Sequence, residues 1–207
     1  MKTSETSSPV ARFRELLGQP GVLIVPGCYD ALSAKLVEKS GFPVAYMTGF
    51  GSSASLLGQP DTGIMDFTQM STHAGNLAQS INIPLIADGD TGYGNAINTY
   101  HTVKTYAKLG VAAIQLEDQV FPKRCGHTQG KAIVPLDDML GKLRAALDAA
   151  AEQDIVIIAR TDARSVEGFR AALDRCLSFE ETGADVIFME APKSIEEMRS
   201  VTKRIKK

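Results

Sequence analysis

Short runs of β-branched and aliphatic residues recur along the chain and alternate with longer segments in which apolar residues have helical spacing. The runs predict six strands, at residues 22–25, 44–47, 84–87, 112–116, 155–159 and 186–189. Each run is almost continuously apolar, which is typical of strands that are covered on both faces. We therefore expect a parallel sheet whose strands are joined by helices, rather than a half-exposed antiparallel sheet.

The segments between the predicted strands have the amphipathic spacing of surface helices. They predict helices at residues 31–39, 67–80, 96–109, 136–152, 166–181 and 195–205. Gly41, Gly110 and Gly183 follow three of these segments, where a helix commonly ends on a left-handed glycine. No linker or low-complexity tract divides the chain, so we expect a single domain over residues 1–207.

The residues at the ends of the predicted strands indicate a barrel. They are Gly27, Thr48, Asp88, Glu117, Arg160 and Glu190. In an α/β (β/α)8 TIM barrel the active site forms at the C-terminal ends of the strands, so these residues would converge there. A doubly wound sheet is less consistent with the sequence, because PGCYDALS lacks the glycine pattern of a phosphate loop. Closure requires eight strands, and we therefore expect a barrel truncated after the sixth βα unit, lacking its C-terminal βα units.

The composition indicates a globular protein with a small-molecule ligand. Of the 207 residues, 44% are hydrophobic and 22% are charged, and the formal net charge is −2. This length allows one sizeable core, and this charge offers no field for nucleic acid or an anionic membrane. The first ten residues lack the apolar core of a secretory signal, and no apolar run is long enough to span a bilayer. We expect a cytoplasmic protein with no nucleic-acid or membrane partner.

One cysteine lies among charged residues. Cys28, Cys125 and Cys176 are too widely spaced for a disulfide framework or a zinc site, which indicates a reducing compartment. The segment IQLEDQVFPKRCGHTQGK at 114–131 places Cys125 beside two cations and a histidine. Because neighbouring positive charge favours a thiolate, we predict that this thiol exchanges protons near neutral pH. The alternative is a solvated charged loop with an incidental cysteine.

Six motifs, in order along the chain, resemble the isocitrate lyase and phosphoenolpyruvate mutase superfamily. They are PGCYDALSAKL, YMTGFGSSASLLGQPD, ADGDTGYG, QLEDQVFPKRCGH, IARTDA and FMEAP. The resemblance implies a (β/α)8 barrel that binds Mg2+ and makes or breaks C–C or P–C bonds of α-keto or α-hydroxy carboxylates. Lyases of this family carry a Lys-Arg/Lys-Cys-Gly-His loop, whereas its phosphonate mutases carry Asn-Ser at the positions of Cys125 and Gly126. The branch of methylisocitrate and 2,3-dimethylmalate lyases is favoured.

The resemblance also implies a metal site. In it Asp88 is the direct ligand of Mg2+, with Mn2+ as an alternative, while Asp61, Asp90 and Glu117 hold the metal's water molecules. Clustered carboxylates suit Mg2+, which prefers hard oxygen ligands and usually keeps several waters. The alternative for Asp90 is a turn residue or a helix cap.

By the same resemblance, Thr48, Gly49 and Phe50 bind the carboxylate of the keto product through backbone N–H groups and a hydroxyl. Arg160 can clamp a carboxylate with two hydrogen bonds, although an ion pair with Asp162 or Glu190 is an equal alternative.

Tyr46 is a candidate for contacting and deprotonating the substrate hydroxyl; the alternative is a core tyrosine with a satisfied hydroxyl. The remaining residues that we expect at the site are Lys123, Arg124 and His127 for the second carboxylate, and Gly126, Phe188 and Glu190 for the substrate pocket.

The expected reaction is a Mg2+-dependent retro-aldol cleavage of a substituted malate or a 2-methylisocitrate-like 2-hydroxy acid. It gives pyruvate or glyoxylate and a carboxylic acid, with Cys125 protonating the departing carbanion. The alternatives are an oxaloacetate hydrolase, a phosphonopyruvate-type P–C bond enzyme, and a poorly active barrel fragment. The resemblance implies a homotetramer. With two βα units missing, open sheet edges would favour loose packing and irregular association, and we expect that assembly to fail.

Overall fold

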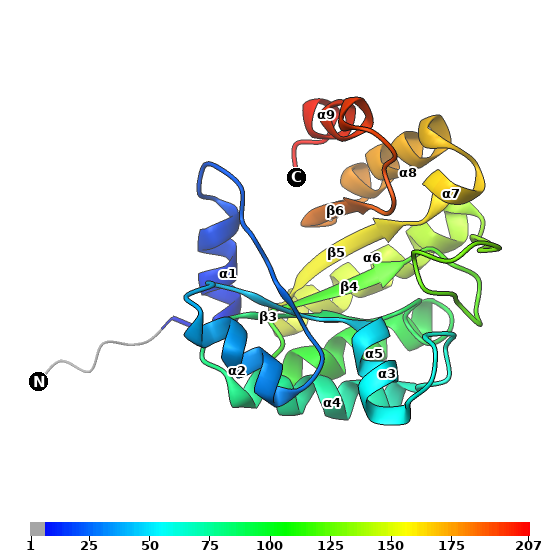
Figure 1. Cartoon of the computed structure of the whole chain (residues 1–207). Helices are drawn as coiled ribbons and strands as arrows, with labels where there is room; N and C mark the ends of the chain where they lie inside the picture. Colours follow the sequence, from blue (N-terminus) through cyan, green and yellow to red (C-terminus); the bar gives the residue numbers. More distant parts are fainter. Residues whose placement is uncertain (1–6) are drawn as a thin grey trace, which may run out of the picture.

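The computed structural model describes residues 7–207 and contains one parallel sheet (Figure 1). Its strands follow the order of the chain: β1 Gly27–Cys28, β2 Ala45–Met47, β3 Leu85–Asp88, β4 Ala113–Glu117, β5 Val156–Thr161 and β6 Val186–Met189. This confirms the α/β class and a partial barrel, because six strands are present among the described residues and β1 and β6 form the two edges. Residues 1–6, part of the segment from which we inferred the lack of a secretory signal, lie outside the described residues.

The described residues form nine helices, most of which connect the strands and cover the outer face of the sheet (Figure 1). They are α1 Pro9–Leu17, α2 Ala31–Lys39, α3 Gly49–Leu57, α4 Phe67–Ser80, α5 Ala96–Lys108, α6 Leu136–Gln153, α7 Ala163–Val166, α8 Phe169–Thr182 and α9 Ile195–Arg204. Asp30, Asp66 and Asn95 begin α2, α4 and α5 with reciprocal capping boxes, which satisfy backbone N–H groups that have no partner inside the helix. Within residues 7–207 no helix combines the length and hydrophobicity that a bilayer crossing requires.

The three glycines expected to end helices do so. Gly41, Gly110 and Gly183 have φ values of 84°, 87° and 106°, a region that residues with a Cβ rarely adopt. The prediction of these helix ends is confirmed.

Two predicted elements differ from the structure. The first strand lies at β1 and not at residues 22–25, because ladder hydrogen bonds form where Gly27 and Cys28 meet β2, while Val22 and Ile24 are exposed. The helix predicted at 166–181 begins three residues later, as α8 at Phe169, because Gly168 before it adopts φ 96°. The helices α1, α3 and α7 were not predicted.

The two faces of the sheet carry separate hydrophobic clusters. The larger one lies between the sheet and the outer helices and includes Tyr106 of α5 and Leu143 of α6, both fully buried. The smaller one lies on the inner face, where Phe13 of α1 packs with Ile86 and Ile158. Because α1 covers only part of the inner face, space remains beside it for a cavity.

Candidate active site

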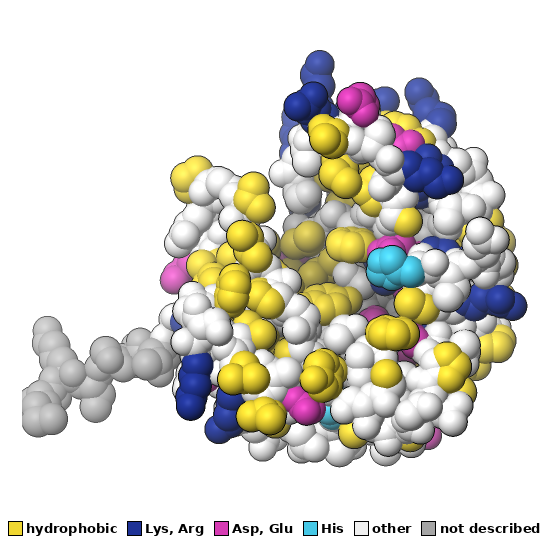
Figure 2. Space-filling view, viewed as in Figure 1, with side chains coloured by type: hydrophobic (Ala, Val, Ile, Leu, Met, Phe, Trp, Pro, Cys, Tyr) yellow, Lys and Arg dark blue, Asp and Glu magenta, His cyan; other side chains and the backbone are white. Residues whose placement is uncertain are grey.

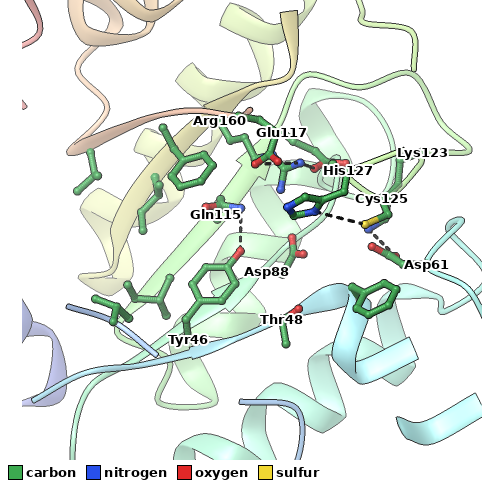
Figure 3. Close-up of a pocket in the computed structure, with 18 of the residues that line it drawn as sticks. Tyr46, Thr48, Asp61, Asp88, Gln115, Glu117, Lys123, Cys125, His127 and Arg160 are labelled. Carbon is green, nitrogen blue, oxygen red and sulfur yellow. Dashed lines mark hydrogen bonds and ion pairs between the residues drawn. The ribbon is translucent and has the colours of Figure 1, made fainter. Parts of the chain in front are cut away.

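A cavity of about 550 Å3 lies along the inner face of the sheet. Figure 2 shows the molecule hollowed on this side, with hydrophobic side chains gathered on the walls. One part is apolar and includes Phe13, Leu23 and Ile158. The other part is polar and is built from strand ends and the loop after β4 (Figure 3). The predicted site residues that line it are Tyr46, Thr48, Phe50, Asp61, Asp88, Glu117, Lys123, Cys125, Gly126, His127, Arg160, Phe188 and Glu190.

Three predicted site residues do not line this cavity: Gly49, Asp90 and Arg124. Arg124 is exposed, and its guanidinium donates to the carbonyl of Gln129 at 3.4 Å. Arg124 lines instead an adjoining cavity, which shares Lys123 and Cys125 with the first one. Asp90 is buried, and its backbone adopts a left-handed conformation with φ 48°.

Asp88 ends β3 and is held by the backbone. Its Oδ2 accepts a hydrogen bond from Gly49 N–H at 3.2 Å, and its Oδ1 accepts one from Asp90 N–H at 3.1 Å. A Cβ at Gly49 would lie 2.4 Å from Asp88 Oδ2, so this close approach requires glycine. The N–H of Gly49, expected to bind a product carboxylate, is engaged by Asp88 in this structure. The hydroxyl of Thr48 likewise accepts from Gly51 N–H and caps α3.

Lys123 joins two of the predicted metal-site carboxylates. Its Nζ lies 2.6 Å from Asp61 Oδ1 and 2.7 Å from Asp90 Oδ1, and the lysine side chain is 3% exposed. Burial opposes the charge of the ammonium, but the surrounding carboxylates outweigh this effect and raise the pKa of Lys123. In the part of the chain that the structure describes, no three His, Cys, Asp or Glu side chains are grouped as ligands of one metal ion. Lys123 supplies the positive charge between Asp61 and Asp90.

Glu117 ends β4 and carries an unsatisfied oxygen into the cavity. Its Oε1 is buried and has no hydrogen-bond partner among the described residues, while Oε2 lies 3.4 Å from Arg160 Nη2. Burial raises the pKa of Glu117 well above its ordinary value, because the opposing charge of Arg160 does not compensate and Asp88 adds repulsion. An orphaned carboxylate oxygen near Asp88 fits a cation with hard oxygen ligands.

Arg160 of β5 is enclosed by carboxylates. It donates to Asp162 from Nε at 2.9 Å and from Nη2 at 3.1 Å, and Nη2 lies 3.7 Å from Glu190 Oε2. Its guanidinium also lies over the ring of Phe188, 5.9 Å from the centroid. The ion pairs with Asp162 and Glu190 are the structural alternative that we considered from the sequence, and Arg160 lines the cavity as well.

The loop between β4 and α6 carries Cys125 and His127 over the polar end of the cavity (Figure 3). The distance between Cys125 Sγ and His127 Nδ1 is 4.0 Å. Cys125 is half-buried, whereas Cys28 and Cys176 are fully buried, and burial raises the pKa of these two thiols to about 11 and about 12. Among the three thiols, Cys125 is the one placed for chemistry.

Two polar residues of the site were missed in the sequence. Gln115 lines the cavity from the middle of β4, and its Nε2 donates to the hydroxyl of Tyr46 at 2.8 Å. The sequence does contain a signal for this residue, because a glutamine inside an otherwise apolar strand indicates a polar role. Lys131 donates to the carbonyl of Gly126, and no feature of the sequence distinguished it from a surface lysine.

Comparisons with known proteins agree with this geometry. The family described as phosphoenolpyruvate phosphomutase matches residues 13–207. A 2,3-dimethylmalate lyase of Eubacterium barkeri is 48% identical over 94% of this chain and 68% of its own length. A 2-methylisocitrate lyase of Aeropyrum pernix is 42% identical over 93% of this chain and 62% of its own length.

Solved structures show the same relationship. The crystal structure of a 2,3-dimethylmalate lyase superposes with a TM-score of 0.92 at 40% identity, covering 97% of this chain and 68% of that one. An oxaloacetate acetylhydrolase bound to 3,3-difluorooxalacetate also gives a TM-score of 0.92 at 41% identity, covering 96% and 69%. The fold is that of an α/β protein with a cavity at the C-terminal ends of its strands. The chain belongs to the phosphoenolpyruvate mutase/isocitrate lyase superfamily and spans about two thirds or less of the length of its curated relatives.

Proposed function

We propose that this protein is a carbon–carbon lyase that cleaves a substituted malate or a 2-methylisocitrate-like 2-hydroxy acid to a keto acid and a carboxylic acid. The observation that carries the proposal is the placement of Cys125 over the same cavity as Asp88, Glu117 and Arg160. A ligand in this cavity would therefore contact both a proton donor, Cys125, and a cation that binds carboxylates, Arg160. The lyases among the chain's relatives support the same class of reaction.

Mg2+, or Mn2+ in its place, belongs to this proposal. Asp88 would hold the metal directly, with Asp61, Asp90 and Glu117 acting through water, and the unsatisfied Oε1 of Glu117 fits such a role. The bound ion would supply Lewis-acid polarisation of the substrate's oxygen atoms and fix the orientation of the keto acid. Lys123 would then have to share Asp61 and Asp90 with the metal's water molecules.

The chain's own residues supply the remaining steps. Arg160, fixed by its ion pair with Asp162, presents positive charge to a substrate carboxylate. The hydroxyl of Tyr46 accepts from Gln115, which leaves its proton free to donate to a substrate oxygen. The substrate hydroxyl gives its proton to a water molecule at the polar end of the cavity, its O–H electron pair forms the C=O bond of the keto acid, and the C–C bond breaks to leave a carbanion on the departing acid. Cys125 then gives its proton to this carbanion, whose electron pair becomes the new C–H bond, and the resulting thiolate regains a proton from solvent. Phe13 and Ile158 on the apolar wall limit access of water to that carbanion.

A second candidate is hydrolysis of oxaloacetate to oxalate and acetate. It is favoured by the similarity to an oxaloacetate acetylhydrolase, which is as high in TM-score as the similarity to the lyase. A P–C bond reaction is less favoured, because Cys125 and Gly126 occupy the positions that separate the lyase loop from the mutase loop. A cytoplasmic location remains an expectation from the sequence, and a homotetramer is what the family resemblance implies.

A substrate panel tests the proposal. The protein with Mg2+ is incubated with 2,3-dimethylmalate, 2-methylisocitrate, other substituted malates, oxaloacetate and phosphonopyruvate. Pyruvate, glyoxylate, oxalate and phosphate are then measured. We expect keto-acid release from one or more of the substituted malates. Release of oxalate alone identifies the hydrolase, release of phosphate identifies a P–C bond enzyme, and no product from any compound contradicts the proposal.

A further inference from the structure

The loop at residues 118–135 is closed at its base, and further hydrogen bonds made by Gln119, Thr128 and Lys131 hold the part near its tip. The base is a short antiparallel pair, in which Val120 N–H donates to Ala132 O at 2.8 Å and Val134 N–H donates to Asp118 O at 2.9 Å. Nearer the tip, the side-chain amide of Gln119 bonds to the backbone of Arg124 in both directions, each at 2.9 Å. The contacts at the base and those of Gln119 fix residues 118–124 but do not touch the three residues that follow.

Lys131 holds the tip itself. Its Nζ donates to the carbonyl oxygen of Gly126 at 2.6 Å and to Asp162 Oδ1 at 2.6 Å. The lysine side chain is 1% exposed. Gly126 lies between Cys125 and His127, so this hydrogen bond acts at the centre of the segment that faces the cavity.

Asp162 links the same contact to Arg160. Its carboxylate is fully buried and accepts hydrogen bonds from Arg160 Nε and Nη2 as well as from Lys131. Although burial opposes ionisation, Arg160 and Lys131 hold the pKa of Asp162 below its ordinary value. One anion therefore orients both the guanidinium at the end of β5 and the ammonium that holds the loop.

The tip has little freedom next to Arg160. A Cβ built on Gly126 would lie 2.5 Å from Arg160 Nη2 and 2.6 Å from Glu190 Oε1. A small shift of Gly126 would therefore change its packing against the very side chains that line the polar end of the cavity.

We propose that Lys131 is a positioning residue, which holds the Gly126 carbonyl against Asp162 and thereby sets Cys125 and His127 over the cavity in register with Arg160. The effect of this positioning on catalysis rests on the proposed function, whereas the positioning of the loop tip by Lys131 does not. A purely structural ion pair is a weaker account, because Lys131 Nζ donates to the Gly126 carbonyl as well as to Asp162 Oδ1. What Lys131 adds is the contact with Gly126.

The test is the rate at which Cys125 is alkylated by iodoacetamide in the absence of substrate and metal, followed by peptide mass spectrometry. At about pH 10 a thiol is largely ionised, so the rate reports exposure of the sulfur. In Lys131→Met the loop tip loses its hydrogen bond. We expect Cys125 to react about tenfold faster or more. This is the change in population that corresponds to losing one charge-assisted hydrogen bond that holds the loop in its protected position.

Cys28 and Cys176 are internal controls, because both are fully buried and should stay protected in a folded variant. Lys142→Met is the matched control. Lys142 is also a partly buried lysine, and it donates to the backbone carbonyl of Thr91 at 3.0 Å, away from this loop. It should leave Cys125 labelling unchanged. If Lys131→Met does not fold, Lys131→Gln is used, since its shorter side chain cannot bridge both acceptors and should give an intermediate increase.

The outcomes separate the two proposals. Faster labelling of Cys125 alone supports the positioning role, even if no substrate is found for the protein. An unchanged or slower rate overturns it, and so does a parallel increase at all three thiols, which would show general loosening. Where the lyase reaction is observed, Lys131→Met should lower kcat more than it changes KM, and Lys131→Arg should restore part of the loss.

Discussion

The side-chain amide of Gln115 on β4 donates a hydrogen bond at 2.8 Å to the hydroxyl of Tyr46 on β2, across the intervening strand β3. Burial raises the pKa of Tyr46 well above its ordinary value, and the charge of Asp88 adds to this effect. The phenol therefore remains protonated at neutral pH. This favours Tyr46 as a hydrogen-bond donor to substrate, and it disfavours the base role that we considered from the sequence.

Tyr46→Phe should accordingly reduce turnover while the protein stays folded. Loss of one buried hydrogen bond of about 1–1.5 kcal/mol corresponds to roughly tenfold in rate. The matched control is Tyr100→Phe, which removes a hydroxyl bonded to Glu152 on the outer helices. Steady-state kinetics on the substrate identified by the panel checks the prediction. Equal rates for the two variants would make Tyr46 a core residue only.

Cys125→Ser should bind product and turn over poorly. A serine hydroxyl is far less acidic than a thiol, and general acid–base groups contribute about 10²–10⁴-fold to rate. Product binding is measured by calorimetry and turnover by keto-acid release. Near-normal turnover would show that Cys125 is not the proton donor and would weaken the lyase proposal.

Asp88→Asn should abolish activity that depends on Mg2+ or Mn2+, because the amide removes the charge of the proposed direct ligand. The amide oxygen can still accept a hydrogen bond from Gly49 N–H, so the fold should survive. Thermal melting checks the fold, and kinetics with and without EDTA checks the metal. The exposed residue Asp148 provides the control variant Asp148→Asn. Full activity in EDTA would remove the metal from the mechanism.

Much of the fold could be predicted because each βα unit is encoded locally. Residues 31–39, 67–80 and 186–189 were predicted with the bounds that the structure gives, since caps and apolar runs mark them. The first strand was misplaced because its position depends on pairing with β2, which is not a local property. The helix α3 was missed because GFGSSASLL contains two glycines and three serines, and its start depends on capping by Thr48.

The site was predictable to a similar extent. The strand ends and the cysteine loop identified most of the residues that line the cavity. In a barrel the backbone alone brings the strand ends together, independently of the identity of the side chains. The partners of those residues were not predictable. That Lys123 forms ion pairs with Asp61 and Asp90, or that Lys131 donates a hydrogen bond to Gly126, depends on the path of a long loop in three dimensions.

Asp90 should make stability depend on pH in the absence of divalent cations. Burial, together with the charge of Asp88, raises the pKa of Asp90 from 3.8 to about 6. Between these two pKa values the folded state binds more protons than the unfolded state. The stabilisation that Asp90 contributes is therefore largest below pH 3.8 and is lost as pH rises through about 6. Asp90→Asn should therefore gain stability relative to the wild type as pH rises across this window. Urea unfolding at several pH values measures the difference, and Asp148→Asn should follow the wild type. A difference that does not change with pH would contradict the raised pKa.

Gly126→Ala should impair the site more than the small size of the added methyl group suggests. The added methyl would lie 2.5 Å from Arg160 Nη2 and 2.6 Å from Glu190 Oε1, and Arg160 is held in place by Asp162. The loop or the guanidinium must therefore move, at an overpacking cost of about 1–3 kcal/mol. We expect turnover to fall by roughly tenfold or more, in line with that cost.

Gly141→Ala is the matched control for this variant. Gly141 lies inside α6 with nothing within 4 Å of an added Cβ, and the change should stabilise the helix by about 0.5–1 kcal/mol. Unfolding curves and kinetics of both variants check this. If Gly126→Ala matches the wild type in turnover, the loop tip does not depend on its contact with Arg160, and the register between Cys125 and Arg160 is not required for the reaction.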